Sequence, residues 1–442
     1  MQFIRAFIIP LIIILIMVDM AFFRFLLKAS RGVGMSVYFW LVLIALEYYS
    51  FHAFRTINKT SAGLWLYILV HLALYGSILF FSLNERRGFS SPNFKRLIIL
   101  LTLFIIPKIF LAISLIVDDI VRLITYSLKS YTTDDVAVPS RRQAAAWIGL
   151  ALAAIPFVSV LDGIFLGKYR YRVIRKTLYY DDLPDAFDGF TITQLSDIHA
   201  GSFDNAQKVN YGVKMAAAQN SDIIVFTGDM VNNEATEMEP FIDIFSQLNA
   251  NQGMYAVMGN HDYGDYGNFT EQEKKQNIIR LKEIQSEIGF LPLSNNLHTI
   301  ERNGKRLNII GVENWGHAAF FPKYGDLEKA TATVLPNDFN ILLSHDPSHW
   351  DHDLPEYENV INFNKKIHLT LSGHTHGMQF GIEIPGLIKW SPVKLRYKNW
   401  GGLYEKNNRK LYVNRGFGFL AFPGRVGMWP EITVLELRKT KK

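Results

Sequence analysis

Cysteine is absent from the 442-residue chain. Its absence excludes disulfide bonds, thiolate metal sites and a cysteine nucleophile. It leaves the redox compartment open, because a cysteine-free chain suits either side of a membrane. Any metal site in this chain must therefore use nitrogen and oxygen donors.

The C-terminal part of the chain has fewer basic than acidic residues. Residues 1–176 carry 20 Lys and Arg against 8 Asp and Glu, a net charge of +12, whereas residues 177–442 carry 26 against 32, a net charge of −6. The overall charge of +6 therefore belongs to the N-terminal part. A protein that binds nucleic acid needs positive charge on its binding domain, so we expect no nucleic-acid partner.

Hydrophobic residues, in contrast, make up 49% of the chain, which is more than an entirely soluble protein usually has. Four apolar runs lie within residues 1–130, and each approaches the roughly 18 residues that a membrane-spanning helix needs: Phe3–Met20, Val33–Phe51, Ala62–Leu83 and Leu97–Val117. We therefore expect an integral membrane protein with about four spans in residues 1–130 and with membrane lipids as partners.

Residues 131–177 are expected to form a linker with a fifth membrane helix. The apolar run Ala144–Leu161 is long enough to span, although Pro156 favours the alternative of a helix that lies in the interface. The basic and aromatic stretch Lys168–Lys176 follows it.

The Lys and Arg residues between the runs favour a cytoplasmic location for residues 178–442 if all five runs span. The segment that contains Arg141 and Arg142 resembles a twin-arginine export signal, which would carry the next domain outward. It lacks the Phe-Leu-Lys that usually follows the arginine pair, so we expect the cytoplasmic face. Polar residues within the runs are compatible with transport, because intramembrane charges are costly, but they form no obvious relay: Asp19, Glu47, His52, His71 and Lys108.

From about residue 178 onward, short β-branched runs alternate with helical segments. The expected strands are FTITQL, DIIVF, MYAVM, LNIIGV, FNILL, IHLTL, KLYVN and EITVLEL. The expected helices are NAQKVNYGVKMAAAQ, EPFIDIFSQL and EQEKKQNIIRLKEIQ. This pattern predicts a layered α/β domain over residues 178–442.

Residues that can bind metal follow five of these strands directly. Ligands bind beyond the carboxyl ends of strands in open α/β sheets, so these residues are expected to share one crevice. They are Asp197 and His199, Asp229, Asn260 and His261, His345, and His374 and His376.

This inventory suits two divalent ions that share a bridging carboxylate. Nitrogen and oxygen donors favour manganese, iron or zinc over calcium. Two such ions about 3.5–4 Å apart hold the attacking and leaving oxygens of an in-line displacement at phosphorus.

The ordered set Asp-x-His, Gly-Asp, Gly-Asn-His-Asp, His and Gly-His-x-His resembles the calcineurin-like metallophosphoesterases over about Thr191–Leu437. The tail, Asn414-Arg-Gly-Phe-Gly with Pro423-Gly-Arg425 and Pro430-Glu431, is similar to the bacterial membrane-linked branch. That branch includes UDP-diacylglucosamine pyrophosphohydrolases of lipid A synthesis.

The resemblance implies a metallophosphoesterase sandwich domain with seven metal ligands and one acid. Asp229 would bridge the two ions, His261 would protonate the leaving oxygen, and Asp262 would orient His261. The chain departs from the family at Asn232 and Met378, neither of which is a ligand. The remaining ligands would divide into Asp197, His199 and His376 for one metal and Asn260, His345 and His374 for the other.

The resemblance thus implies a phosphohydrolase of the bacterial inner membrane that cleaves a phosphoester or pyrophosphate bond by metal-activated hydroxide. The membrane anchor and the basic stretch favour a phosphorylated lipid or a nucleotide-linked glycolipid as substrate. Two alternatives remain: a hydrolase of soluble phosphodiesters, and a membrane sensor or transporter whose metal domain binds a ligand without turnover.

Overall fold

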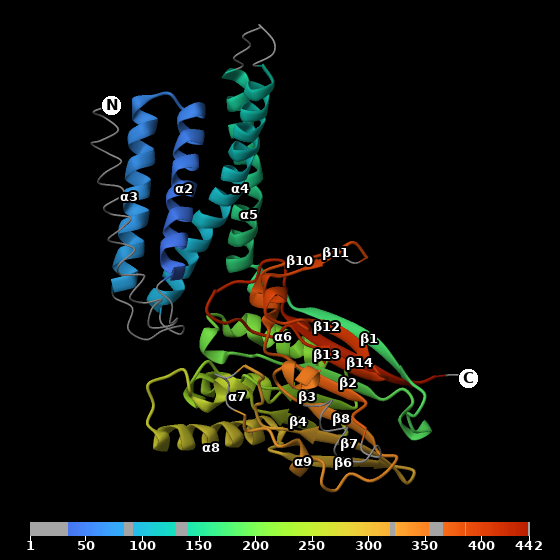
Figure 1. Cartoon of the computed structure of the whole chain (residues 1–442). Helices are drawn as coiled ribbons and strands as arrows, with labels where there is room; N and C mark the ends of the chain where they lie inside the picture. The colour runs from blue at the N-terminus through green and yellow to red at the C-terminus, as the bar shows by residue number, and fades with distance from the viewer. Residues whose placement is uncertain are drawn as a thin grey trace. The chain divides into compact units, whose positions relative to one another are not determined.

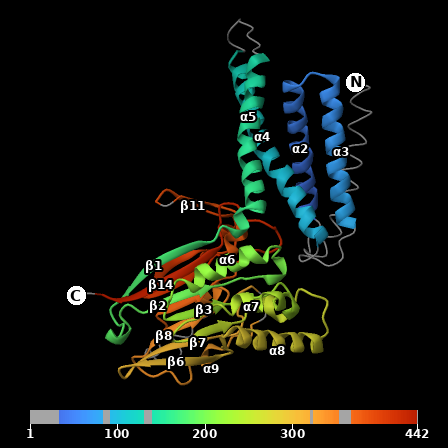
Figure 2. The same cartoon turned by 180° about the vertical axis from the view of Figure 1, so that it is seen from behind.

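The computed structural model describes residues 34–83, 92–129, 139–318, 323–352, 366–384 and 386–440. The chain divides into two compact units, Met1–Asp162 and Gly163–Lys442. Apolar helices make up the first unit, and mixed α/β sheets make up the second (Figures 1 and 2). The apolar run Phe3–Met20 lies outside the described residues.

The apolar helices correspond to four of the five predicted runs. By length and composition, three of the described helices can cross a membrane, over Ser61–Ile78, Pro92–Thr125 and Arg141–Phe165. The third contains the run from Ala144, so that run is long enough to span. The helix formed by the run from Val33 is not among the three. The helices are α2 (Gly34–Ile57), α3 (Ser61–Leu83), α4 (Pro92–Lys129) and α5 (Pro139–Phe165).

A buried ionic cluster joins α2, α3 and α4. The carboxylate of Glu47 accepts hydrogen bonds from the hydroxyls of Tyr67 (2.7 Å) and Tyr75 (2.6 Å) and from the ammonium of Lys108. His71 Nε2 lies 3.5 Å from the same carboxylate. The sequence showed no relay among the polar residues of the spans, but the structure joins three of them, because the helices turn these side chains toward one another. A charge paired in this way is compatible with burial among apolar helices.

Two six-stranded sheets form the second unit. The order of the first sheet is β1-β14-β2-β3-β4-β5, and that of the second is β12-β13-β9-β8-β7-β6. In the first sheet the strands are β1 (Arg172–Tyr180), β14 (Glu431–Lys439), β2 (Thr191–Leu195), β3 (Ile223–Thr227), β4 (Met254–Val257) and β5 (Leu291–Pro292). In the second they are β12 (Gly402–Lys406), β13 (Arg409–Val413), β9 (Leu369–Ser372), β8 (Phe339–Leu343), β7 (Lys305–Gly311) and β6 (Asn296–Arg302).

The two sheets pack face to face around one apolar core. Ile192 and Val225 from the first sheet lie in the same buried cluster as Ile309 and Leu343 from the second. Three helices cover the outer face of the first sheet (Figure 1): α6 (Ala206–Ala217), α7 (Ile242–Phe245) and α8 (Glu271–Ile288). The short helix α9 (Leu327–Ala330) packs on the outer face of the second sheet. The predicted layered α/β architecture is confirmed.

Local sequence explains where the longest of these helices begins and ends. The Thr270 hydroxyl accepts a hydrogen bond from the Glu273 backbone N–H, and the Glu273 carboxylate accepts one from the Thr270 backbone N–H. Gly289 ends α8 at a φ of 105°. This is a capping box followed by a left-handed glycine.

All eight predicted strands are present, but two other expectations need revision. The segment 239–248, expected to form one helix, instead forms the 3₁₀ turn Glu239–Phe241 and the single-turn α7. The strand β1 begins at Arg172, inside the stretch expected to be a juxtamembrane linker, and pairs in parallel with β14. It lies at the edge of the first sheet, and only Leu178 and Tyr180 among its residues are buried.

Leu343 tests how much the sandwich core contributes to stability. Its side chain is fully buried between the sheets. We expect Leu343→Ala to lower the free energy of unfolding by about 2–5 kcal/mol, measured by thermal unfolding of the detergent-solubilised chain. Ile279→Ala, at an exposed position of α8, should change it by less than about 0.5 kcal/mol. Equal losses in the two variants would contradict this assignment of the core.

Candidate metal centre

The predicted ligand residues follow strands of both sheets and converge at one edge of the sandwich. Asp197 and His199 follow β2, Asp229 follows β3, Asn260 follows β4, His345 follows β8, and His374 and His376 follow β9. Two triads have ligand atoms that all lie within 4.8 Å of one another: Asp197, His199 and His376, and Asp229, His345 and His374.

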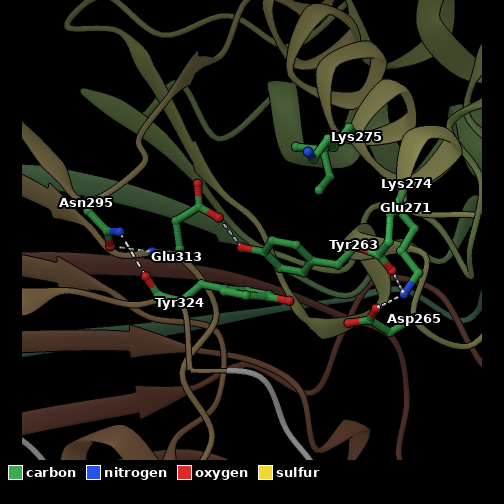
Figure 3. A pocket seen from close by; sticks show the side chains of 9 residues that line it. Tyr263, Asp265, Glu271, Lys274, Lys275, Asn295, Glu313 and Tyr324 are labelled. Carbon is green, nitrogen blue, oxygen red and sulfur yellow. Dashed lines mark hydrogen bonds and ion pairs between the residues drawn. The ribbon is translucent and has the colours of Figure 1, made fainter.

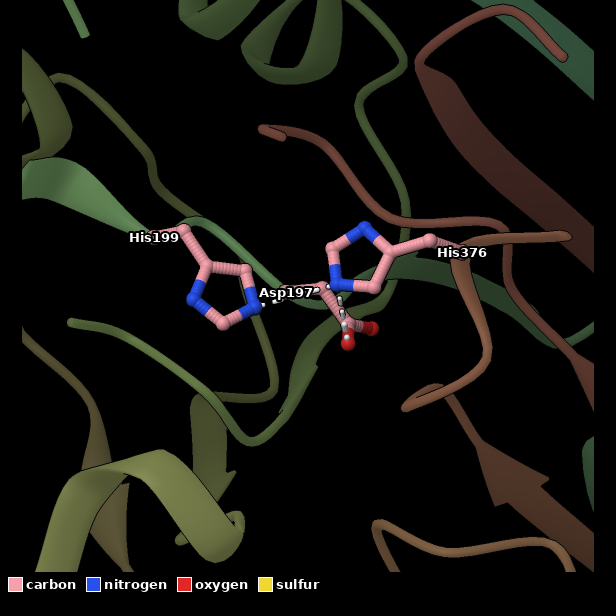
Figure 4. Close-up of side chains that lie close together, drawn as sticks. All are labelled: Asp197, His199 and His376. Atoms are coloured by element: carbon pink, nitrogen blue, oxygen red, sulfur yellow. Dashed lines mark hydrogen bonds and ion pairs between the residues drawn. The ribbon is translucent and has the colours of Figure 1, made fainter. Parts of the chain in front are cut away.

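The first triad is fully enclosed by protein. His199 Nε2 lies 3.0 Å from His376 Nε2, and the latter lies 3.1 Å from Asp197 Oδ1. Figure 4 shows the two imidazole rings converging on the carboxylate of Asp197. All three side chains are buried.

The second triad lies beside Asn260. His345 Nε2 is 3.1 Å from Asp229 Oδ2 and 3.3 Å from His374 Nδ1. Asn260 Oδ1 lies 2.8 Å from His374 Nδ1. The second group of donors therefore contains an amide oxygen, two ring nitrogens and a carboxylate.

Asp229 connects the two groups. Its Oδ2 is 3.1 Å from His345 Nε2 and 3.5 Å from His199 Nε2. Burial alone would raise the pKa of Asp229, but His345 and His261 lower it well below its ordinary value. One ionised carboxylate thus faces both groups.

The spacing of these atoms fits divalent ions. Ligands bound at about 2.0–2.2 Å around one ion lie about 3–3.5 Å from one another, and the separations between the donor atoms span 2.8–3.5 Å. Although burial alone would lower it, Asp229 raises the pKa of His345 to about 10. Binding of a cation to the ring nitrogen of His345 would therefore displace the proton from that nitrogen.

Hydrogen bonds outside the triads set which nitrogen each imidazole directs inward. His345 Nδ1 donates to the carbonyl of Thr227 (2.7 Å), which leaves Nε2 as the ligand atom. His374 Nε2 donates to the Tyr397 hydroxyl (2.8 Å), which in turn donates to Asp346 (3.2 Å). Burial and the Asp346 charge raise the pKa of Tyr397, so the phenol keeps its proton. Sequence reasoning missed Tyr397, because no motif connects it to the strand ends.

The backbone of the centre is strained. Five of the seven predicted ligands have a positive φ, between 48° and 69°: Asp197, His199, Asp229, His374 and His376. Such conformations cost of the order of 1–3 kcal/mol each in a non-glycine residue. Gly373 permits the closest approach, because a Cβ there would lie 2.2 Å from the Asp197 carboxylate. This explains the glycine that precedes the paired histidines.

His261 is oriented differently from the expectation. Asp262 accepts hydrogen bonds from the backbone N–H groups of Asp229, Met230, Val231 and Gly259, so it fixes the loop that carries Asp229 and does not orient His261. The carbonyl of Asn232 performs that task, since it accepts from His261 Nδ1 at 2.8 Å. Because a backbone atom acts here, this contact does not depend on the side chain of residue 232, where the chain departs from the family it resembles.

Tyr266 lies beside His261 and the ligand Asn260. Its ring stacks on His261 with a centroid distance of 4.4 Å. Its hydroxyl accepts a hydrogen bond from Asn260 Nδ2 at 2.9 Å, which leaves Oδ1 of the amide directed at the second triad.

Arg425 has a structural role. It is fully buried and donates to the carbonyls of Gly418 and Met428, with Nη2 3.1 Å from His376 Nδ1. Among the other histidines, His349 and His368 are buried.

Two pockets lie near the metal centre, one beside Tyr397 and one beside Tyr263. One of about 390 Å³ adjoins Tyr397 and is lined by basic side chains, namely His317, His352, Arg396 and Lys398. The other, of about 550 Å³, is drawn in Figure 3 and is lined by Tyr263 and Tyr324. Many of its charged groups pair with one another, as Lys274 does with Asp265, so it is less suited to an anion than the basic pocket.

Tyr397 offers a test of the hydrogen-bond network. We expect Tyr397→Phe to weaken the binding of one ion by about 10–100-fold, because His374 loses the partner that orients it. Equilibrium dialysis against buffered Mn²⁺ with metal analysis measures this. Tyr211→Phe, at an exposed position, is the matched control. An unchanged affinity in Tyr397→Phe would contradict the role of the network.

Both parts of the chain match families of known proteins. Residues 30–168 match the family described as "Probable Calcineurin-like phosphoesterase, transmembrane domain", and residues 190–378 match "Calcineurin-like phosphoesterase". The metallophosphoesterase YkuE of Bacillus subtilis is 29% identical over 62% of this chain and 88% of its own length. A metallophosphoesterase of Helicobacter pylori is 26% identical over 91% of this chain and 98% of its own length.

A further relative has a named substrate. The UDP-2,3-diacylglucosamine pyrophosphatase LpxG of Chlamydia trachomatis is 25% identical over 61% of this chain and 92% of its own length. With both regions matched and both triads assembled, the chain belongs to the calcineurin-like metallophosphoesterases: it is a membrane protein and a metal-dependent phosphoester hydrolase, and its fold implies two divalent ions.

Proposed function

We propose that this chain hydrolyses a phosphoester or pyrophosphate bond in a phosphorylated lipid or nucleotide-linked glycolipid of the bacterial inner membrane. The observation that carries the proposal is the position of Asp229, whose Oδ2 lies within 3.5 Å of an imidazole nitrogen from each triad. A carboxylate shared in this way is what a dinuclear centre requires.

In this proposal Asp229 bridges the two ions, and manganese is the favoured metal, with iron or zinc as alternatives. Asp197, His199 and His376 hold one ion, and Asn260, His345 and His374 hold the other. When bound, the pair of ions supplies an activated water and binds the oxygens at phosphorus.

His261 is the proposed acid. Its Nδ1 is held by the Asn232 carbonyl, and among the described residues its Nε2 has no hydrogen-bond partner. Burial lowers the pKa of His261, whereas a phosphate anion beside the ring would raise it again. A proton on Nε2 is then available to the departing oxygen.

Three features support a lipid-linked substrate. The chain carries membrane helices. A basic pocket with Arg396 and Lys398 adjoins Tyr397, next to the second triad, and suits the anionic part of a nucleotide or headgroup. One relative acts on a UDP-linked diacylated sugar, as its name states. The distribution of basic residues favours the cytoplasmic face for the catalytic unit.

The proposal is tested with the detergent-solubilised chain and Mn²⁺. We expect turnover of bis(p-nitrophenyl) phosphate and preferential turnover of a UDP-linked diacylated glucosamine over UDP-N-acetylglucosamine. Asp229→Asn should reduce kcat/KM by at least about a thousandfold, because the shared charge is lost. His298→Gln, at an exposed position, should leave it unchanged. Equal turnover of the two UDP compounds would favour soluble substrates and overturn the lipid assignment.

The acid role of His261 has its own signature. We expect His261→Gln to reduce kcat by about 10²–10⁴-fold with an alkyl leaving group, and much less with p-nitrophenolate, which departs without protonation. Measuring both diesters with the same variant separates proton transfer from phosphate binding. A loss of the same size for the two leaving groups would show that His261 only binds phosphate.

A further inference from the structure

The hairpin formed by β10 (Ile382–Ile384) and β11 (Ile388–Trp390) has an exposed apolar face. Ile382 pairs with Trp390 and Ile384 with Ile388. Cross-strand partners and residues two apart share a face, so these four side chains lie on one side of the ribbon. Their exposed fractions are between 43% and 52%.

The polar residues of the hairpin lie on its other face and bind the domain. Glu383 accepts hydrogen bonds from Arg415 at 2.8 and 2.9 Å. Its cross-strand partner Lys389 donates to the carbonyl of Gly401 and lies 5.0 Å from the ring of Trp400. In a sheet with one face in water the polar face is outward. In this hairpin the polar face is turned toward the domain instead, and its contacts keep the apolar face exposed.

Two more leucines extend this surface. Leu387 in the hairpin turn is 80% exposed, and Leu395, at the end of the 3₁₀ turn Pro392–Leu395, is 94% exposed. We call the six residues the apolar rim: Ile382, Ile384, Leu387, Ile388, Trp390 and Leu395. So many exposed apolar side chains within one short segment of the chain are typical of an interaction site.

The charge around the apolar rim is positive although the unit that carries it is acidic. Residues 382–398 contain one acidic residue and four basic ones, a net charge of +3, whereas residues 177–442 have a net charge of −6. The basic residues are Lys389, Lys394, Arg396 and Lys398. Apolar side chains beside cationic ones complement the interface of a bilayer with anionic lipids, where tryptophan is also enriched.

A backbone hydrogen bond also fixes the base of the hairpin within the second unit. The carbonyl of Val426 accepts it from Gly381 N at 3.0 Å. Gly381 directly precedes β10, so the hairpin is held at its base as well as through Glu383 and Lys389.

The same segment borders the metal centre at both ends. It follows the 3₁₀ turn His376–Gln379, which begins with a predicted ligand, and it leads into Tyr397, which orients His374. A lipid whose acyl chains contacted the apolar rim would therefore have its phosphate close to the two triads.

We propose that the apolar rim inserts into the interface of a bilayer containing anionic lipids, and that the substrate reaches the metal centre there without leaving the membrane. The catalytic part of this inference rests on the proposed function, whereas the insertion does not. The occupant of the surface is lipid, rather than a second copy of the chain.

Fluorescence quenching in nanodiscs of phosphatidylethanolamine and phosphatidylglycerol tests the insertion. Because the chain has no cysteine, Leu387→Cys and Glu287→Cys each accept a single fluorescent label in the full-length protein; Glu287 lies at an exposed position of α8. We expect nitroxide-bearing lipids to quench the label at 387 at least about fivefold more than the label at 287, and aqueous iodide to show the opposite order. Iodide quenching of both sites alike would overturn the proposal. Protection of site 387 from both quenchers would also overturn it, because protein would then cover the rim.

A kinetic comparison tests the consequence for catalysis. For the double variant Leu387→Asp with Leu395→Asp, we expect the ratio of turnover of bilayer-embedded substrate to turnover of the soluble diester to fall by about tenfold or more, because carboxylates are repelled from an anionic interface. Turnover of the soluble diester reports whether the metal centre is intact. An unchanged ratio in the double variant would contradict this inference. A wild-type chain that hydrolyses neither substrate would instead contradict the proposed function, whatever the result of the fluorescence quenching.

Discussion

The rest of the structure depends on one constraint: imidazole rings that follow strands of two different sheets must lie within about 3.5 Å of a single carboxylate. His199 follows a strand of the first sheet and His345 a strand of the second, yet both lie within 3.5 Å of Asp229 Oδ2. The shared core of the sandwich meets this requirement, because residues such as Val225 and Leu343 hold the two sheets face to face. A small rotation between the sheets would separate the two halves of the centre.

The same constraint explains why the strain lies where it does. Ligands must turn sharply away from the strand ends to face one another, and five of them adopt left-handed backbone conformations. The surrounding contacts hold them there. Asp262 accepts from four backbone N–H groups around the loop of Asp229, and the Asp197 carboxylate accepts from the backbone of His374 at 2.9 Å. The same hydrogen bonds thus fix both the carboxylates and the backbone of the centre.

Much of the fold, and the convergence of the proposed ligands, could be predicted from the sequence, because both leave local signals. Buried strands are short β-branched runs, and each ligand stands directly behind one of them. Tyr397 could not be predicted, since its contact with His374 depends on how a distant loop folds back. The strand β1 was missed because its basic residues are typical of a juxtamembrane stretch. The contacts of Tyr67 and Lys108 with Glu47 depend on how each helix is rotated about its axis, which cannot be read from the apolar runs. The reversed polarity of the hairpin likewise appears only when the partners of Glu383 and Lys389 are known.

The most direct test of the central claim is to count the metal ions and measure how they interact. The chain saturated with Mn²⁺ should bind two ions, and electron paramagnetic resonance should show the multiline signal of an exchange-coupled pair bridged by Asp229. A single ion per chain, or two ions with the spectra of isolated Mn²⁺, would contradict the account of a shared carboxylate.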